Sequence, residues 1–257
     1  MQGSLGEKIG QGAFSDVHTW APGQVVKLFK SGVPRRLGWH EARVTRAVFA
    51  AGAPAPEVFG EVSVEGALRH RAVSLRGTDP DAALAQRRHV ACTNGRDPRV
   101  PLHVRSQDAA AAADVLSLRD WLAALQLSGG SVPKHIATGI LTLIERVRPE
   151  DGLCHADLHP GNVIMTADGP RLVDWTGAVR APAAFDLACG HITLVEVAPE
   201  FIDDPQRPRA YNAAAQSEYA RLAGMSPAAL TAVMETYLPI ACVINLLRGA
   251  GGALRER

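Results

Sequence analysis

Three oxygen-bearing side chains, those of Asp157, Asn162 and Asp174, fall within one short stretch, HADLHPGNVIMTADGPRLVDW, that runs from residue 155 to residue 175. Asn162 follows Asp157 by five residues and precedes Asp174 by twelve. Carboxylate and amide oxygens are the ligands that a hard cation such as Mg²⁺ prefers. The pattern therefore predicts that Asn162 and Asp174 share a cation and that Asp157 faces the same space.

A hairpin is the element that must position these residues. The runs 163–165 and 171–173 are compatible with strands and flank the turn signal Thr-Ala-Asp-Gly-Pro. Folding the strands about that turn brings Asn162 and Asp174 together at the open end, because cross-strand neighbours lie roughly 5 Å apart. A surface hairpin with solvated polar ends is the alternative, and it suffices for any one of these residues taken alone.

A glycine-rich turn stands near the start of the chain. The segment GQGAFSDV, residues 10–17, follows the pattern G-x-G-x-x-G-x-V except that Ser15 stands at the third glycine. Gly10 and Gly12 have no side chain and permit unusual dihedral angles, so backbone amides can approach a phosphate. An ordinary glycine hairpin is the alternative for this motif on its own.

Two charged residues follow the turn in an order that suits the same purpose. Lys27 lies in the apolar run 24–30, which we expect to be a strand. Glu41 lies fourteen residues further on, in a helix predicted over 38–51 from apolar residues at helical spacing. Either residue could be a surface charge, but their order and spacing favour a pair beside a phosphate-binding turn.

The composition limits what else the chain does. Its 257 residues can bury a sizeable core, as one bilobal domain or two small ones. A net charge of +1, with 47% apolar and 21% charged residues, gives no support to a nucleic-acid or membrane partner. The first residues have no apolar run of signal-peptide length and the four cysteines have no CxxC spacing, so we expect a cytoplasmic protein.

These motifs resemble those of a known family. H-x-D-x-x-x-x-N with a later Asp resembles the catalytic and metal-binding loops of kinase-like phosphotransferases. The sequence HADLHPGN at residues 155–162, followed later by Asp174-Trp175, is most similar to the motif of the aminoglycoside phosphotransferase and choline kinase branch. The resemblance covers about residues 6–60 and 114–245 and implies a bilobal, protein-kinase-like α+β fold. Its small mixed lobe, with an antiparallel sheet, would be residues 1–113, and its larger, mainly helical lobe residues 114–257.

The resemblance also implies roles for individual residues. Asp157 would be the catalytic base or the carboxylate that orients the acceptor hydroxyl, and Asn162 and Asp174 would be the Mg²⁺ ligands. The nucleotide, ATP or GTP, would be bound by Gly10, Gly12, Ser15, Lys27 and Glu41. His155 and Asp186 would support the catalytic loop. We leave His159 without an assigned role.

The implied activity is transfer of the γ-phosphoryl group to a hydroxyl of a small, cationic molecule such as an aminoglycoside or an amino alcohol. Phe185 comes only eleven residues after Asp174, which leaves no room for a long segment that docks a peptide. A solvated helix end is the first interpretation of four carboxylates that follow, and if they line the acceptor site they would favour a cationic acceptor: Glu196, Glu200, Asp203 and Asp204. Acceptor, nucleotide and oligomeric state stay open.

The segment 69–112 does not fit this scheme. Between residues 69 and 106 there are eight arginines and three histidines but no glutamate, lysine or aromatic residue, where the fold needs an apolar strand and a linker for the adenine. We expect poor order there. A functional basic patch, a disordered insertion and an out-of-frame translation are the three interpretations. The alternative to an active kinase is therefore an impaired, non-catalytic kinase-like protein with a damaged nucleotide pocket.

Overall fold

The structure is a computed structural model that describes residues 4–12, 14–63, 71–76, 115–127, 152–166, 169–200 and 202–253, together with residues 138, 139, 142, 143, 145 and 147. The chain forms two compact units. Unit 1 consists of residues 1–91 and 160–176, and unit 2 of residues 92–159 and 177–257. The hairpin that carries Asn162 and Asp174 thus groups with the amino-terminal sheet, whereas the sequence suggested the division 1–113 and 114–257.

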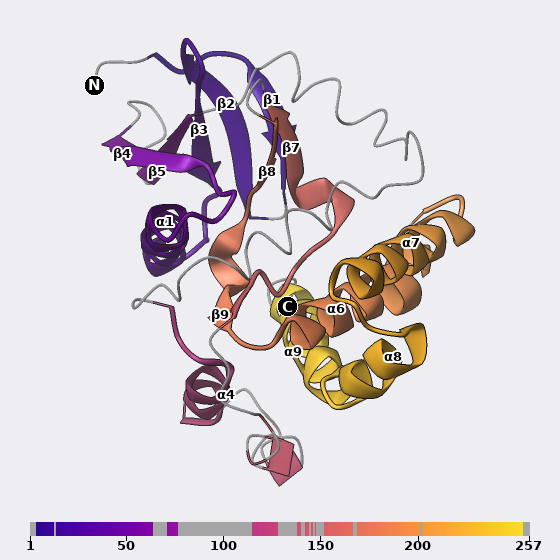
Figure 1. Cartoon of the computed structure of the whole chain (residues 1–257). Helices are drawn as coiled ribbons and strands as arrows, with labels where there is room; N and C mark the ends of the chain where they lie inside the picture. The colour runs from indigo at the N-terminus through magenta and orange to yellow at the C-terminus, as the bar shows by residue number, and fades with distance from the viewer. Residues whose placement is uncertain are drawn as a thin grey trace. The chain divides into compact units, whose positions relative to one another are not determined.

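Unit 1 is built on an antiparallel sheet of five strands in the order β1-β2-β3-β5-β4 (Figure 1). The strands are β1 (Lys8–Gln11), β2 (Ser15–Ala21), β3 (Gln24–Phe29), β4 (Glu57–Ser63) and β5 (Arg71–Arg76). Strand β3 is the apolar run expected from the sequence, and Val25, Val26 and Leu28 are buried. Gly23, with φ of 67°, occupies the tight turn that joins β2 to β3.

The expectation of poor order across residues 69–106 is wrong for six of them, Arg71–Arg76. Arg71–Arg76 forms β5, which pairs with β3 on one side and β4 on the other. Strand pairing uses backbone groups, and Val73 and Leu75, two residues apart in the sequence, are compatible with it in spite of the flanking arginines. An out-of-frame reading is therefore not needed to supply this strand. Residues 77–112 lie outside the described residues.

Helix α1 (Arg35–Ala50) packs on the sheet of unit 1. It begins three residues earlier than expected, directly after Pro34, and the chain turns away at Gly52, whose φ is 87°. The helix approaches β3 closely, because a Cβ atom at Gly38 would lie only 2.9 Å from Cε2 of Phe29. Glycine at position 38 therefore sets how near α1 comes to β3.

The expected hairpin is present in unit 1 as β7 (Val163–Thr166) and β8 (Gly169–Leu172). A 3-10 turn, η2 (Pro160–Asn162), precedes it and a second, η3 (Trp175–Gly177), follows it. The Leu172 N–H donates to the Pro54 carbonyl at 2.7 Å, which ties the hairpin to the segment after α1. Trp175 is fully buried and donates through Nε1 to the Leu172 carbonyl at 2.7 Å.

Unit 2 is mainly helical (Figure 1). Two short strands, β6 (Leu153–Cys154) and β9 (Val179–Arg180), pair antiparallel. The helical elements are α4 (Leu118–Leu127), α6 (Ala183–His191), the π-helical turn η4 (Ile192–Val197), the 3-10 turn η5 (Ala198–Glu200), α7 (Gln206–Leu222), α8 (Pro227–Glu235) and α9 (Leu238–Ala253).

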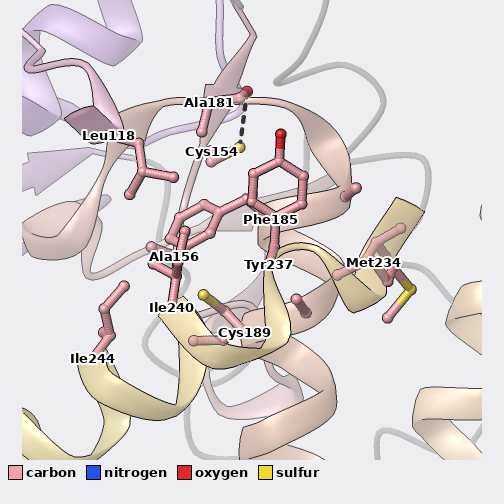
Figure 2. Packing of buried hydrophobic residues seen from close by; sticks show 14 of the residues in the cluster. Leu118, Cys154, Ala156, Ala181, Phe185, Cys189, Met234, Tyr237, Ile240 and Ile244 are labelled. Carbon is pink, nitrogen blue, oxygen red and sulfur yellow. Dashed lines mark hydrogen bonds between the residues drawn. The ribbon is translucent and has the colours of Figure 1, made fainter. Parts of the chain in front are cut away.

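The core of unit 2 gathers around Phe185 of α6 (Figure 2). The Phe185 and Tyr237 rings meet edge to face, with centroids 6.3 Å apart, and the Cys154 Sγ donates to the Ala181 carbonyl at 3.2 Å. Residues 238–247, LPIACVINLL, form an apolar run within α9, and this helix contributes Ile240 to the core. Among the described residues no single helix is long and apolar enough to cross a membrane, and the bent pair α8–α9 meets that criterion only when both helices are counted together.

Candidate functional site

Lys27, Glu41 and Asp174 come together in unit 1. Lys27 Nζ donates to Glu41 Oε1 at 2.5 Å and lies 3.7 Å from Asp174 Oδ1. The side chains of Lys27 and Glu41 are only 14% and 10% exposed, whereas that of Asp174 is 45% exposed. One lysine thus lies beside two carboxylates, one buried and one open to solvent.

The pKa values of the buried pair follow from this arrangement. Burial lowers the pKa of Lys27, but attraction from Glu41 and Asp174 outweighs burial, so the pKa lies above its usual value. Burial raises the pKa of Glu41, attraction to Lys27 opposes this, and repulsion from Asp174 adds to it. Lys27 therefore keeps its positive charge near neutral pH.

Strand β3 and helix α1 hold the pair in place. Lys27 Nζ lies 5.7 Å from the centroid of the Phe29 ring, the same ring that packs against Gly38 of α1. Glu41 is one turn further along that helix. The close approach of α1 at Gly38 therefore determines how near the Glu41 carboxylate comes to Lys27.

A second set of contacts joins α1 to the end of the hairpin. His40 Nε2 lies 3.1 Å from the Thr176 carbonyl oxygen. The Thr176 hydroxyl donates to Asp174 Oδ1 at 2.8 Å. No sequence pattern indicated a role for His40 or Thr176, because both contacts depend on the tertiary packing of α1 against residues far along the chain.

Asn162 and Asp174 flank the open end of the hairpin, as its register requires. The Val173 N–H donates to the Asn162 carbonyl at 2.9 Å, one step beyond the pair Val163–Leu172. Asp174 has φ of 66°, a left-handed conformation that aspartate tolerates better than most residues. Asn162 is buried and Asp174 is exposed.

The donor set at this end of the hairpin fits Mg²⁺. One carboxylate and one amide oxygen suit an ion that usually keeps water and substrate oxygens as further ligands. Within the described residues there is no group of three or more His, Cys, Asp and Glu side chains that could hold a metal without such help. An Mg²⁺ ion bound by Asn162 and Asp174 would therefore need further oxygen ligands, from water or from a phosphate.

The glycine turn is closed by three hydrogen bonds. The Gly12 N–H donates to the Ser15 carbonyl at 2.7 Å, and the Lys30 N–H donates to the Phe14 carbonyl at 2.9 Å. Lys30 Nζ donates to the Gly12 carbonyl at 2.6 Å. Ser15, which replaces the third glycine of the pattern, is buried. Lys30 was not singled out by the sequence, where a lone lysine after a strand carries no signal.

In unit 2, Asp186 braces the loop that leads to Asp157. Its carboxylate accepts hydrogen bonds from the backbone N–H groups of His155 at 2.9 Å and Ala156 at 2.6 Å. Ala156 has φ of 62°, which is strained for a residue other than glycine. These contacts are those of a bracing residue, and the buried His155 belongs to the same loop.

Asp157 itself is partly exposed. Its side chain is 31% exposed, and Oδ2 lies 3.8 Å from Nε2 of His159, a contact that is ionic only when the imidazole is protonated. The structure thus gathers Lys27, Glu41 and Asp174 in unit 1 and sets Asp157 beside a loop braced by Asp186 in unit 2.

The four carboxylates considered for an acceptor, Glu196, Glu200, Asp203 and Asp204, are all exposed in unit 2. Asp204 Oδ1 accepts a hydrogen bond from the Gln206 N–H at 3.1 Å at the start of α7.

A polar contact that the sequence did not predict lies nearby in the chain: Asn212 Nδ2 is 3.1 Å from His191 Nδ1. Burial lowers the pKa of His191, and attraction to Glu196 offsets part of this.

The comparisons with known proteins agree with these motifs. Residues 16–225 match the model of the Phosphotransferase enzyme family, APH. The chain therefore belongs to the APH phosphotransferase family. No curated protein has significant similarity to the chain.

Solved structures of aminoglycoside phosphotransferases share the fold. A thermostable mutant of APH(4)-Ia in a ternary complex with AMP-PNP and hygromycin B has 17% identity and a TM-score of 0.51, with 98% of this chain and 91% of that chain covered. APH(2")-IIia in complex with GDP and kanamycin has 12% identity and a TM-score of 0.54, with coverage of 97% and 88%. APH(3'')-Id from Streptomyces rimosus ATCC10970, in complex with ADP and streptomycin, has 16% identity and a TM-score of 0.50, with coverage of 87% and 88%. The protein-kinase-like fold predicted from the sequence is confirmed.

Proposed function

We propose that this protein is a small-molecule kinase that transfers the γ-phosphoryl group of ATP or GTP to a hydroxyl of a small cationic molecule. The observation that carries the proposal is the buried ion pair of Lys27 and Glu41 beside Asp174. A lysine held by a buried carboxylate keeps a fixed charge and a fixed position, which phosphate binding and phosphoryl transfer both need. The similar proteins bind AMP-PNP, GDP or ADP, which supports a nucleotide as donor.

The charges of this cluster imply a metal ion. Lys27 contributes one positive charge, and Glu41 and Asp174 contribute two negative charges. A nucleoside triphosphate is strongly anionic, so the net negative charge of the cluster alone would repel it. Mg²⁺ held by Asn162 and Asp174 would reverse that balance and would neutralise charge on the transferred phosphoryl group.

Asp157 is the residue we assign to the acceptor hydroxyl, as base or orienting group. It precedes Asn162 by five residues, so the chain itself keeps the two Cα atoms within about 18 Å. Asp186 holds the backbone on its amino-terminal side through His155 and Ala156. That brace restricts where the Asp157 carboxylate can go, and a carboxylate must be positioned within hydrogen-bond reach of the hydroxyl to accept its proton.

The proposed acceptor is a small cationic molecule that carries a hydroxyl group. Glu196, Glu200, Asp203 and Asp204 form an exposed acidic group in unit 2, and such a group attracts cations at long range. The similar structures hold hygromycin B, kanamycin and streptomycin, which supports an aminoglycoside-like or amino-alcohol acceptor. We place the enzyme in the cytoplasm, where ATP and GTP are available.

The test is calorimetric titration of the full chain with ATP and with GTP, with and without Mg²⁺, followed by a coupled assay over a panel of acceptors. We expect nucleotide binding that depends on Mg²⁺ and turnover with a cationic hydroxylated acceptor. High salt should weaken the binding of that acceptor, and a neutral polyol serves as the control for this effect. Mg²⁺-dependent binding without turnover of any acceptor would favour the impaired, non-catalytic alternative. Absence of nucleotide binding would overturn the proposal.

A further inference from the structure

Lys30 contacts the glycine turn at two points. Its backbone N–H donates to the Phe14 carbonyl at 2.9 Å, and its side-chain Nζ donates to the Gly12 carbonyl at 2.6 Å. It directly follows β3, the strand that carries Lys27. The turn from residue 10 to residue 15 therefore has a cation fixed at its tip by the strand that also supplies the buried lysine.

Among the residues that the structure describes, no carboxylate forms an ion pair with Lys30, unlike Lys27 and Lys8. Lys27 lies beside the carboxylates of Glu41 and Asp174, and Lys8, in strand β1 before the turn, lies 3.1 Å from Asp16 Oδ1. Lys30 Nζ, by contrast, bonds a neutral carbonyl oxygen. A phosphate oxygen is a stronger acceptor for an ammonium group than a carbonyl is, so an anion near the turn would compete well for this side chain.

We propose that Lys30 is a second phosphate-binding cation of this protein, which binds the nucleotide phosphates from the turn while Lys27 binds them from the strand. In the free protein the Gly12 carbonyl holds Nζ at the turn. When the phosphate chain binds, Nζ donates to a phosphate oxygen. This inference rests on the proposed nucleotide-dependent activity and adds a residue to its site.

The proposal requires that the effect of Lys30 grow with the number of phosphates. Lys30→Met keeps most of the aliphatic chain and removes the charge, and we expect it to weaken ATP binding about 10- to 100-fold in the presence of Mg²⁺. AMP lacks the terminal phosphates, so the same variant should weaken AMP binding by less than about threefold. Lys30→Arg keeps a cation and should restore most of the ATP affinity.

The experiment is calorimetric titration of the full chain with ATP, ADP and AMP. Lys8→Met is the matched control, because it removes a lysine from β1, the strand that leads into the turn, and Asp16 already offsets the charge of that lysine. We expect it to change ATP affinity by less than about twofold. Thermal unfolding of each variant checks folding, and Lys30→Gln is the second variant should Lys30→Met unfold.

The outcomes separate this proposal from the one on which it rests. If the wild-type protein binds ATP but Lys30→Met binds it equally well, or loses ATP and AMP affinity to the same extent, Lys30 has only a structural role in the turn and the inference is wrong. If the wild-type protein binds no nucleotide, the proposed function fails and this inference fails with it.

Discussion

The carboxylate of Asp186 accepts a hydrogen bond of 2.6 Å from the backbone N–H of Ala156, whose φ of 62° places it in a left-handed conformation. The same carboxylate accepts the His155 N–H, so one fully buried side chain satisfies two adjacent backbone donors. A strained residue persists only where its surroundings over-determine it. Asp186 is the side chain that holds Ala156, the residue directly before Asp157, in this conformation.

Replacing Asp186 by Asn should destabilise unit 2. The amide has one oxygen where two backbone donors require acceptors, and its NH₂ group would face one of them. We expect a loss of about 2–4 kcal/mol in the free energy of unfolding, measured by urea denaturation. Glu235→Gln, an exposed change of the same kind at the end of α8, should cost less than about 0.5 kcal/mol. Equal stability of the two variants would remove Asp186 from this role.

A side chain at position 38 should push α1 away from β3. Gly38→Val places atoms where the Phe29 ring already lies, so we expect a loss of about 1–3 kcal/mol of stability and weaker ATP binding, because α1 carries Glu41. Gly60→Val is the matched control, since a Cβ atom at Gly60 in β4 meets nothing within 4 Å. Thermal unfolding and ATP titration measure both effects, and equal behaviour of the two variants would contradict the explanation.

His191 should make unit 2 less stable in acid. Burial lowers its pKa in the folded state, so the unfolded chain binds the proton more readily and stability rises with pH through the range below the ordinary value of 6.5. Protonation of Nδ1 would also remove its hydrogen bond to the Asn212 amide. Denaturation at several pH values should show a shallower slope for His191→Gln. An unchanged slope would assign the acid sensitivity to other groups.

Two aspartates should have separable effects on catalysis. Asp157→Ala should lower kcat by about 10²- to 10⁴-fold and leave nucleotide affinity nearly unchanged, because it removes the group assigned to the acceptor hydroxyl. Asp174→Asn should weaken Mg²⁺-dependent nucleotide binding. Steady-state kinetics and calorimetry with the same protein preparations distinguish the two. Equal effects on nucleotide affinity would argue against this division of roles.

The sequence predicted elements whose signals are local. The turn residues 166–170 indicated the hairpin, and helical spacing indicated α1, although Pro34 rather than Gly38 marks its start. The meeting of Lys27 with Glu41 followed from order and spacing, and the two side chains do pair. Their part in binding a nucleotide stays a prediction.

Contacts that join distant segments could not be predicted in the same way. Strand β5 was not expected because its arginines obscured the pattern, yet backbone pairing with β3 and β4 depends little on those side chains. The side-chain contact of Lys30 depends on the packing of the glycine turn against the end of β3. The contact between His40 and Thr176 depends on the packing of α1 against the end of the hairpin. The acceptor roles of the exposed acidic residues remain predictions for the same reason, since no local signal separates them from a solvated surface.

Unit 1 is discontinuous in the chain, and this has a consequence for its synthesis. Residues 92–159 belong to unit 2 and are made before the hairpin of residues 160–176 that completes unit 1. At a translation rate of about 5–20 residues per second, the strands with Lys27 are synthesised some seconds before the segment that contains Asn162 and Asp174. A truncated product that ends before residue 160 lacks both proposed metal ligands, so it cannot form the charge balance on which the proposed binding of ATP depends. Fragments produced by stalled ribosomes would therefore not sequester the nucleotide.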